Sequence, residues 1–128
     1  MMKRRIFNWY RERLADVQSL SLNAEPSGTS NSYWMVTAVL DPALGLDKFK
    51  LMAEMDKRNI DTRPFFTPLS ALPAFEDRPQ SQRFIPVDSV GARVAAHGIN
   101  LPSGYNMTEE LVDVVARAFR EVVKEMAG

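Results

Sequence analysis

The chain has 128 residues, of which 45% are hydrophobic, and its sixteen basic residues balance its sixteen acidic ones. This size fits one domain, residues 1–128, that buries roughly two-thirds of its unfolded surface. A net charge of zero gives no electrostatic reason to expect nucleic acid or an anionic membrane as a partner. The absence of cysteine excludes disulfides and thiolate chemistry. No apolar run suits a membrane span or a signal peptide, so we expect a soluble, cytoplasmic protein.

A first helix is predicted over residues 3–17, where apolar side chains recur at helical spacing. No residue suited to capping precedes it, and Lys3, Arg4 and Arg5 lie at the positive end of the helix dipole. This pattern indicates the latter part of a longer helix that has been cut. The alternative is a frayed N-terminus.

A central strand is predicted over residues 33–40, because this segment is apolar on both faces and rich in β-branched and aromatic residues. Asp47 is predicted to cap a helix that ends at Arg58, and Asn59 is predicted to stop it in a left-handed conformation. We expect this helix to bury Phe49, Met52 and Ala53.

The run of residues 60–75 holds three prolines, three phenylalanines and one arginine. Proline removes a backbone donor and favours extended geometry in the preceding residue, so we expect a short strand from Ile60 that leads into a stiff loop. An apolar loop with a single cation is typical of the wall of a pocket or interface. The polar residues 76–86 are predicted to be mobile.

A third helix is predicted over residues 87–97 with Gly98 as its C-cap, followed by an edge strand over residues 99–101. Asn106 or Thr108 is predicted to cap the last helix, which runs to about Met126. Its expected buried residues are Leu111, Val115, Ala118, Val122 and Met126. The resulting order is α-β-α-β-loop-α-β-α, an α+β fold with a small, partly antiparallel sheet and helices packed against it.

The sequence alone shows no catalytic residues and no metal site. His97 is the single histidine, and neither Gly-rich phosphate-binding motif is present. The five lysines fall on polar helix faces or at helix ends, where an amine is poorly desolvated. We therefore expect this chain to bind no cofactor by itself.

Three pieces of sequence in a fixed order carry a resemblance to a known family: N-S-Y-W-M (31–35), N-I-D-T-R-P-F-F-T-P-L with L-P-A-F (59–75), and H-G-I-N-L-P-S (97–103). Together they resemble the C-terminal small domain of the DegT/StrS family of pyridoxal-phosphate-dependent sugar aminotransferases, and especially its perosamine-synthase-like members. The resemblance implies transamination of a keto-sugar nucleotide in polysaccharide or antigen sugar biosynthesis. It also implies that the large domain, which holds pyridoxal phosphate and the Schiff-base lysine, is absent here.

The resemblance places the proline-rich loop beside the active site, so Arg63, Phe65, Phe66 and Ser70 are candidates to line the sugar-nucleotide site. Arg63 is expected to pair with a carboxylate or phosphate of a ligand, or else to form a salt bridge that ties the loop to a helix. Phe65 and Phe66 are expected to cover a sugar or base, with at least one of them in the core, and Tyr33 and Trp34 are expected in the core. Two positions depart from the family: Ser70 replaces a common histidine, and Asn59 replaces a common glycine.

The resemblance implies several partners for the chain: the missing large domain, a nucleotide sugar and a possible homodimer. We expect the domain to be inactive alone and to expose an apolar patch where the large domain would pack, with Phe7, Phe65 and Phe66 as candidates. Two alternatives remain open. In the first, the chain is a stand-alone non-catalytic binding or regulatory module. In the second, it is the non-functional remnant of an aminotransferase gene of this family.

Overall fold

The computed structural model describes residues 1–75 and 89–128, without the side chains of Ser70 and Phe75. The segment 76–86 that was predicted to be mobile, and the predicted helix start at residue 87, lie outside the described residues. Within these ranges, no helix has the length and hydropathy needed to cross a bilayer.

The sheet has the strand order β1-β2-β4-β3, and its pairings are all antiparallel. This confirms the α+β class. The prediction of an edge strand at residues 99–101 is wrong, because β4 is an interior strand with four buried residues. The edge strand β1 was not predicted, since three residues carry too little periodicity to reveal a strand. The strands are β1 (Leu20–Leu22), β2 (Val36–Leu40), β3 (Arg63–Pro64) and β4 (Gly98–Leu101).

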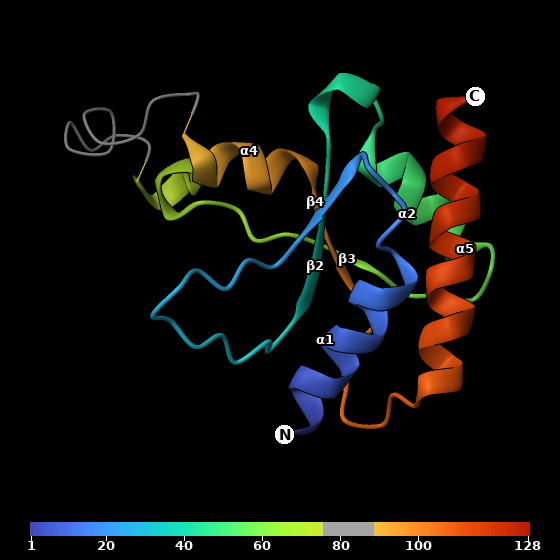
Figure 1. Ribbon diagram of the computed structural model, residues 1–128. Helices are drawn as coiled ribbons and strands as arrows, with labels where there is room; N and C mark the ends of the chain where they lie inside the picture. Colours follow the sequence, from blue (N-terminus) through green and yellow to red (C-terminus); the bar gives the residue numbers. More distant parts are fainter. Residues whose placement is uncertain (76–88) are drawn as a thin grey trace.

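The two faces of the sheet are covered differently. α1 (Met2–Arg13) and α5 (Glu109–Ala127) pack on one side, and α4 (Val90–His97) lies on the other (Figure 1). The central position predicted for the strand within residues 33–40 is confirmed, because β2 lies between β1 and β4. The largest fully buried side chains of the core are Tyr10, Phe119, Ile6, Leu40, Leu51, Met55, Ile99, Val36, Val112 and Val122.

α2 (Lys48–Asp56) begins where the sequence predicts, because the Asp47 carboxylate accepts the N–H groups of Phe49 and Lys50 at 2.8 and 3.4 Å. Asn59 adopts the predicted left-handed conformation with φ of 60°. The predicted buried face is wrong for Phe49, which is 62% exposed, and for Ala53, which is also exposed, whereas Met52 is half-buried against the core. The helix buries Lys48, Leu51 and Met55, and it packs against α5.

α5 begins at the Thr108 cap, whose hydroxyl accepts the N–H of Leu111 at 3.3 Å. Val115, Ala118 and Val122 are buried as predicted. The prediction for Leu111 is wrong, because this residue is exposed and its neighbour Val112 is buried in its place. The helix is turned so that Val112, Phe119 and Val123 also face the core.

Ser89 caps α4, and the chain passes from His97 directly into β4. Gly98 therefore does not end the helix in the left-handed conformation that a glycine C-cap suggests; its φ is −87°. The glycine is needed for space, because a Cβ at this position would lie 2.8 Å from Cβ of Phe65 and 2.5 Å from the carbonyl oxygen of Val94. Phe65 thus packs against bare backbone.

A cluster of polar and aromatic groups fixes the loop before β2 onto α1. Arg4 donates to both oxygens of the Glu25 carboxylate at 2.7 and 3.1 Å, and the Tyr33 hydroxyl donates to the same carboxylate at 2.6 Å. The Tyr33 ring stacks on Phe7 with 3.9 Å between ring centroids. Hydrogen bonds from Arg4 and then from Tyr33 lower the pKa of Glu25 from 4.5 to about 2. We call these three residues, Arg4, Glu25 and Tyr33, the Glu25 cluster.

Substitution of Gly98 by alanine tests the close packing of Phe65. We expect Gly98→Ala to lower the free energy of unfolding by about 1–3 kcal/mol, because the new methyl group overlaps Phe65 and the backbone. Gly91→Ala is the matched control in α4, where the nearest atom to the new Cβ among the described residues is Ser89 Oγ at 4.0 Å. This control is expected to raise stability by about 0.5–1 kcal/mol in urea unfolding. Equal effects of the two substitutions would contradict the packing described.

The Glu25 cluster predicts a pH dependence of stability. A folded-state pKa of about 2, below the ordinary 4.5, means that the carboxylate stabilises the fold above pH 4.5. That stabilisation is lost as the pH falls from 4.5 to 2. The difference in unfolding free energy between the wild type and Glu25→Gln is thus expected to be largest near neutral pH and to vanish near pH 2. Glu121→Gln serves as an exposed control, and a Glu25→Gln difference that stays constant with pH would overturn the assignment.

Candidate functional site

Arg63 lies on the edge strand β3 with its side chain 74% exposed and one guanidinium nitrogen 2.7 Å from the carboxylate of Asp61. This ion pair does not tie the loop to a helix, as one of the two predicted roles of Arg63 required, because Asp61 is only two residues away on the same segment. An exposed ion pair of this kind contributes only about 0–1 kcal/mol. The guanidinium therefore remains accessible to a ligand.

Arg63 lines a hollow of about 650 Å³ between β3, β4 and α5. The walls of this hollow are largely apolar, and Leu111 and Val114 of α5 form part of its rim. Asn100 also lines it and accepts a hydrogen bond from the Thr37 hydroxyl at 2.8 Å. A few polar groups in an apolar hollow are typical of a binding site for a small ligand.

The other predicted site residues do not share this hollow. Phe65 is half-buried over Gly98 and lines a separate hollow of about 670 Å³ beside Thr37 of β2 and Val94 of α4. Phe66 is 54% exposed. The backbone of Ser70 belongs to the short 3-10 turn Leu69–Ala71, and its side chain lies outside the described residues. Of the four, Phe65 and Phe66 lie together, with an edge-on contact at 5.7 Å between ring centroids.

Trp34 is a residue whose role the sequence did not reveal. It was predicted in the core together with Tyr33; Tyr33 is buried, but Trp34 is 63% exposed. Tyr33 has φ of 48°, which ends the strand-like alternation that the sequence pattern assumed. The indole of Trp34 stacks instead on Phe66, with 6.0 Å between ring centroids and 6° between ring planes. We call Trp34 and Phe66 the aromatic shelf.

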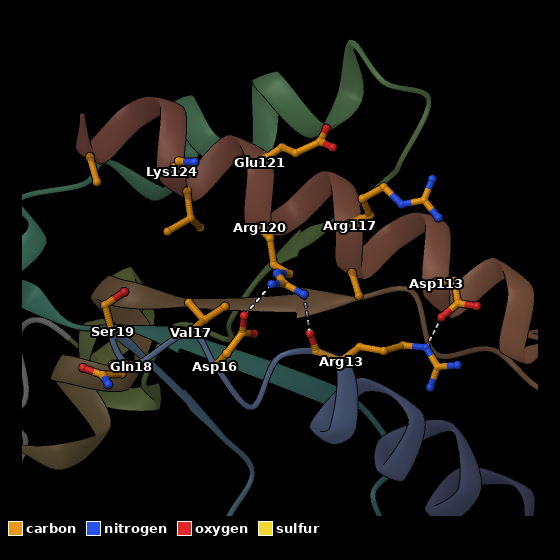
Figure 2. A pocket seen from close by; sticks show the side chains of 13 residues that line it. Arg13, Asp16, Val17, Gln18, Ser19, Asp113, Arg117, Arg120, Glu121 and Lys124 are labelled. Atoms are coloured by element: carbon orange, nitrogen blue, oxygen red, sulfur yellow. Dashed lines mark hydrogen bonds and ion pairs between the residues drawn. The ribbon is translucent and has the colours of Figure 1, made fainter.

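The hollow of about 770 Å³ between the end of α1 and α5 is lined mainly by charged residues (Figure 2). Arg13 donates to Asp113 and to Glu109, and Arg120 donates to Asp16 and to the carbonyl of Arg13. These bonds raise the pKa of Arg13 and lower that of Asp113. Because the charges are paired across the two helices, we assign this network to the joining of α1 and α5.

Lys48 does not fit the role of a Schiff-base lysine for pyridoxal phosphate. Lys48 corrects the prediction that every lysine is well solvated: it is buried, and desolvation lowers the pKa of its ammonium group. Its Nζ donates to the carbonyl of Ala95 in the last turn of α4, and it lines none of the described hollows. A Schiff-base lysine needs a free amine that faces the cofactor. Lys48 instead ties α2 to α4.

Comparison with known proteins gives consistent results. The model of the DegT/DnrJ/EryC1/StrS aminotransferase family matches residues 1–120. The GDP-perosamine synthase of Vibrio cholerae is 30% identical over 92% of this chain, and EpsN of Bacillus subtilis, a putative pyridoxal phosphate-dependent aminotransferase, is 29% identical over 94%. The chain spans about 31% of the length of each.

Solved structures show the same fold. DesI, crystallised in the presence of its TDP-sugar product, aligns over 94% of this chain and 30% of its own with a TM-score of 0.79 and 24% identity. PseC of Helicobacter pylori, an aminotransferase of pseudoaminic acid biosynthesis, aligns over 97% of this chain and 32% of its own with a TM-score of 0.81 and 14% identity. The family match over nearly the whole sequence shows that this chain belongs to the DegT/DnrJ/EryC1/StrS aminotransferase family.

Proposed function

We propose that this chain acts as the C-terminal small domain of a nucleotide-sugar aminotransferase, beside a large domain that holds pyridoxal phosphate. The observation that carries the proposal is the family match over residues 1–120 in a chain that spans about a third of its relatives. The poor fit of Lys48 to the role of a Schiff-base lysine is consistent with this proposal, in which the large domain supplies that lysine. The large domain can be joined to this chain or encoded separately.

In this proposal the chain lines one side of the sugar-nucleotide site with Arg63, Phe65, Phe66 and Ser70. Arg63 would leave Asp61 and bind a phosphate or carboxylate with two parallel hydrogen bonds. Such charge-assisted pairs are stronger than an exposed ion pair, so the exchange is favourable. The exposed ring of Phe66 would cover a flat part of the substrate.

The sheet side that carries the proline-rich loop would face the large domain. This side exposes Phe66 and Leu69 of the loop and Val90 of α4. Phe7, which the sequence suggested for the exposed patch, is buried under Tyr33. A homodimer remains a prediction from the resemblance, and a cytoplasmic location remains a prediction from the sequence alone.

Arg63 is the residue that tests the proposed substrate site. We expect Arg63→Ala to weaken binding of a GDP- or TDP-linked sugar by about tenfold or more, because a charge-assisted hydrogen bond contributes about 1.5–3 kcal/mol. Binding is followed by NMR titration at millimolar ligand. Arg117→Ala, which removes an exposed arginine in the hollow of Figure 2, is expected to bind like the wild type. Unchanged affinity in Arg63→Ala would sink the proposed role.

The chain alone is expected to form no internal aldimine with pyridoxal phosphate and to catalyse no transamination. Absorbance spectra with added cofactor, before and after borohydride reduction, measure this. Surface lysines can react slowly and nonspecifically, so Lys48→Met and Lys124→Met are compared with the wild type. A saturable absorbance band that one of these substitutions abolishes would show a cofactor site in this chain and would contradict the proposal.

A further inference from the structure

The aromatic shelf is an exposed and rigidly backed surface. Trp34 and Phe66 are 63% and 54% exposed, yet their planes lie within 6° of each other. Phe65 supports Phe66 from the side at 63° and is itself seated on Gly98. The exposed, parallel rings of Trp34 and Phe66 present a flat apolar face to a ligand.

The orientation of Trp34 depends on its neighbour Tyr33. Tyr33 is buried in a left-handed conformation that a bulky side chain rarely adopts, so the surroundings must hold it there. Glu25 and Arg4 hold the side chain of Tyr33 through its hydroxyl and ring. The backbone of Tyr33 is held by Asn31, whose Oδ1 accepts the Tyr33 N–H at 2.8 Å. Arg4 also donates to the carbonyl of Asn31 at 3.0 Å, which closes the loop.

We propose that Glu25 is a positioning residue for Trp34 and that the aromatic shelf stacks the planar base of the nucleotide sugar. The nature of the ligand rests on the proposed function, and its place rests on the stacked rings of Trp34 and Phe66. Every nucleobase offers a flat π-face, and stacking on aromatic side chains is a common means of holding one. The GDP and TDP groups in the names of the similar proteins both carry such a base.

The arrangement favours a base over the other flat-faced parts of a substrate. The Glu25 carboxylate accepts from the Tyr33 hydroxyl and its charge is matched by Arg4, so this carboxylate is not free to repel a nucleotide. A phosphate would find its partner at Arg63, which is three residues before Phe66 and carries an accessible guanidinium. The base and the phosphate would thus be bound by neighbouring parts of one loop.

NMR of a Trp9→Phe variant tests the proposal, because Trp34 is then the single indole of the chain. GDP and dTDP at millimolar concentration are expected to shift the Trp34 indole N–H resonance upfield and saturably. Ribose 5-phosphate, which has no base, is expected to leave it in place. No shift with either nucleotide, or an equal shift with ribose 5-phosphate, would overturn the shelf as a base site.

The positioning role of Glu25 is tested in the same background. Glu25→Gln is expected to abolish the Trp34–Phe66 NOEs and most of the nucleotide-induced shift. Glu54→Gln is the matched control, since it removes a carboxylate paired with Lys57 and Arg58 on α2, away from the shelf. Arg4→Met provides a second variant should Glu25→Gln fail to fold. NOEs and shifts that survive both changes would overturn the positioning role.

The outcomes separate this inference from the proposed function. If a nucleotide sugar shifts the amides around Arg63 but not the Trp34 indole, the site stands and the shelf does not. If the Trp34 resonance moves with protein concentration in the absence of ligand, a second copy of the chain covers the shelf and the inference is wrong. Shifts at both places support the two together.

Discussion

The antiparallel pairing of β2 with β4 determines where the candidate functional side chains lie. Val36 pairs with Leu101 and Val39 with Gly98, so the two strands are in contact over their whole common length. Side chains alternate along each strand, and Ala38 and Ile99 therefore join the core. The alternate residues Thr37 and Asn100 point to the other side, where they are buried and hydrogen-bonded to each other at 2.8 Å. The pairing of β3 with β4 places Arg63 opposite Asn100, and the hydrogen bond from the Phe65 N–H to the Gly98 carbonyl places Phe65 beside Gly98.

The two sides of the sheet then have different physical characters. One side holds the hydrophobic core between the sheet, α1, α2 and α5. Ion pairs between α1 and α5 join these two helices at the edge of that core. The other side is covered by α4, which buries none of its residues fully, and by the proline-rich loop. Lys48 holds the last turn of α4 from α2, and Gly98 lets Phe65 approach the backbone. Rings are left exposed on a stiff support, as expected of a surface that binds something else.

The sequence was sufficient for the fold class, the helices and the family, because long amphipathic segments and capping residues are local signals. Asp47, Asn59 and Thr108 act as their residue types predict. It was insufficient for β1 and for the interior place of β4, because pairing between short strands is decided by distant contacts. Part of the buried face of α2 was misjudged, and in α5 Leu111 was predicted in place of Val112, since apolar residues occupy neighbouring stripes of each helix.

The candidate site was only partly predictable for the same reason. Arg63 and Phe66 could be chosen from the loop composition, and both are accessible. Trp34 could not, because the left-handed backbone of Tyr33 interrupts the strand pattern just before it, and the groups that contact Tyr33 come from other segments. A tryptophan in an apolar run otherwise indicates a core position. The resemblance located the proline-rich loop, and the structure adds Trp34 and the residues around Tyr33 that lie beside it.

The central claim is that the proline-rich loop of this family member lines a nucleotide-sugar site. A residue-by-residue map of amide shifts on addition of a GDP- or TDP-linked sugar tests it most directly. We expect the largest shifts to cluster at residues 63–69 and around Trp34. Shifts confined to the charged hollow between α1 and α5, around Arg117 and Arg120, would contradict it, as would a map without any saturable shift.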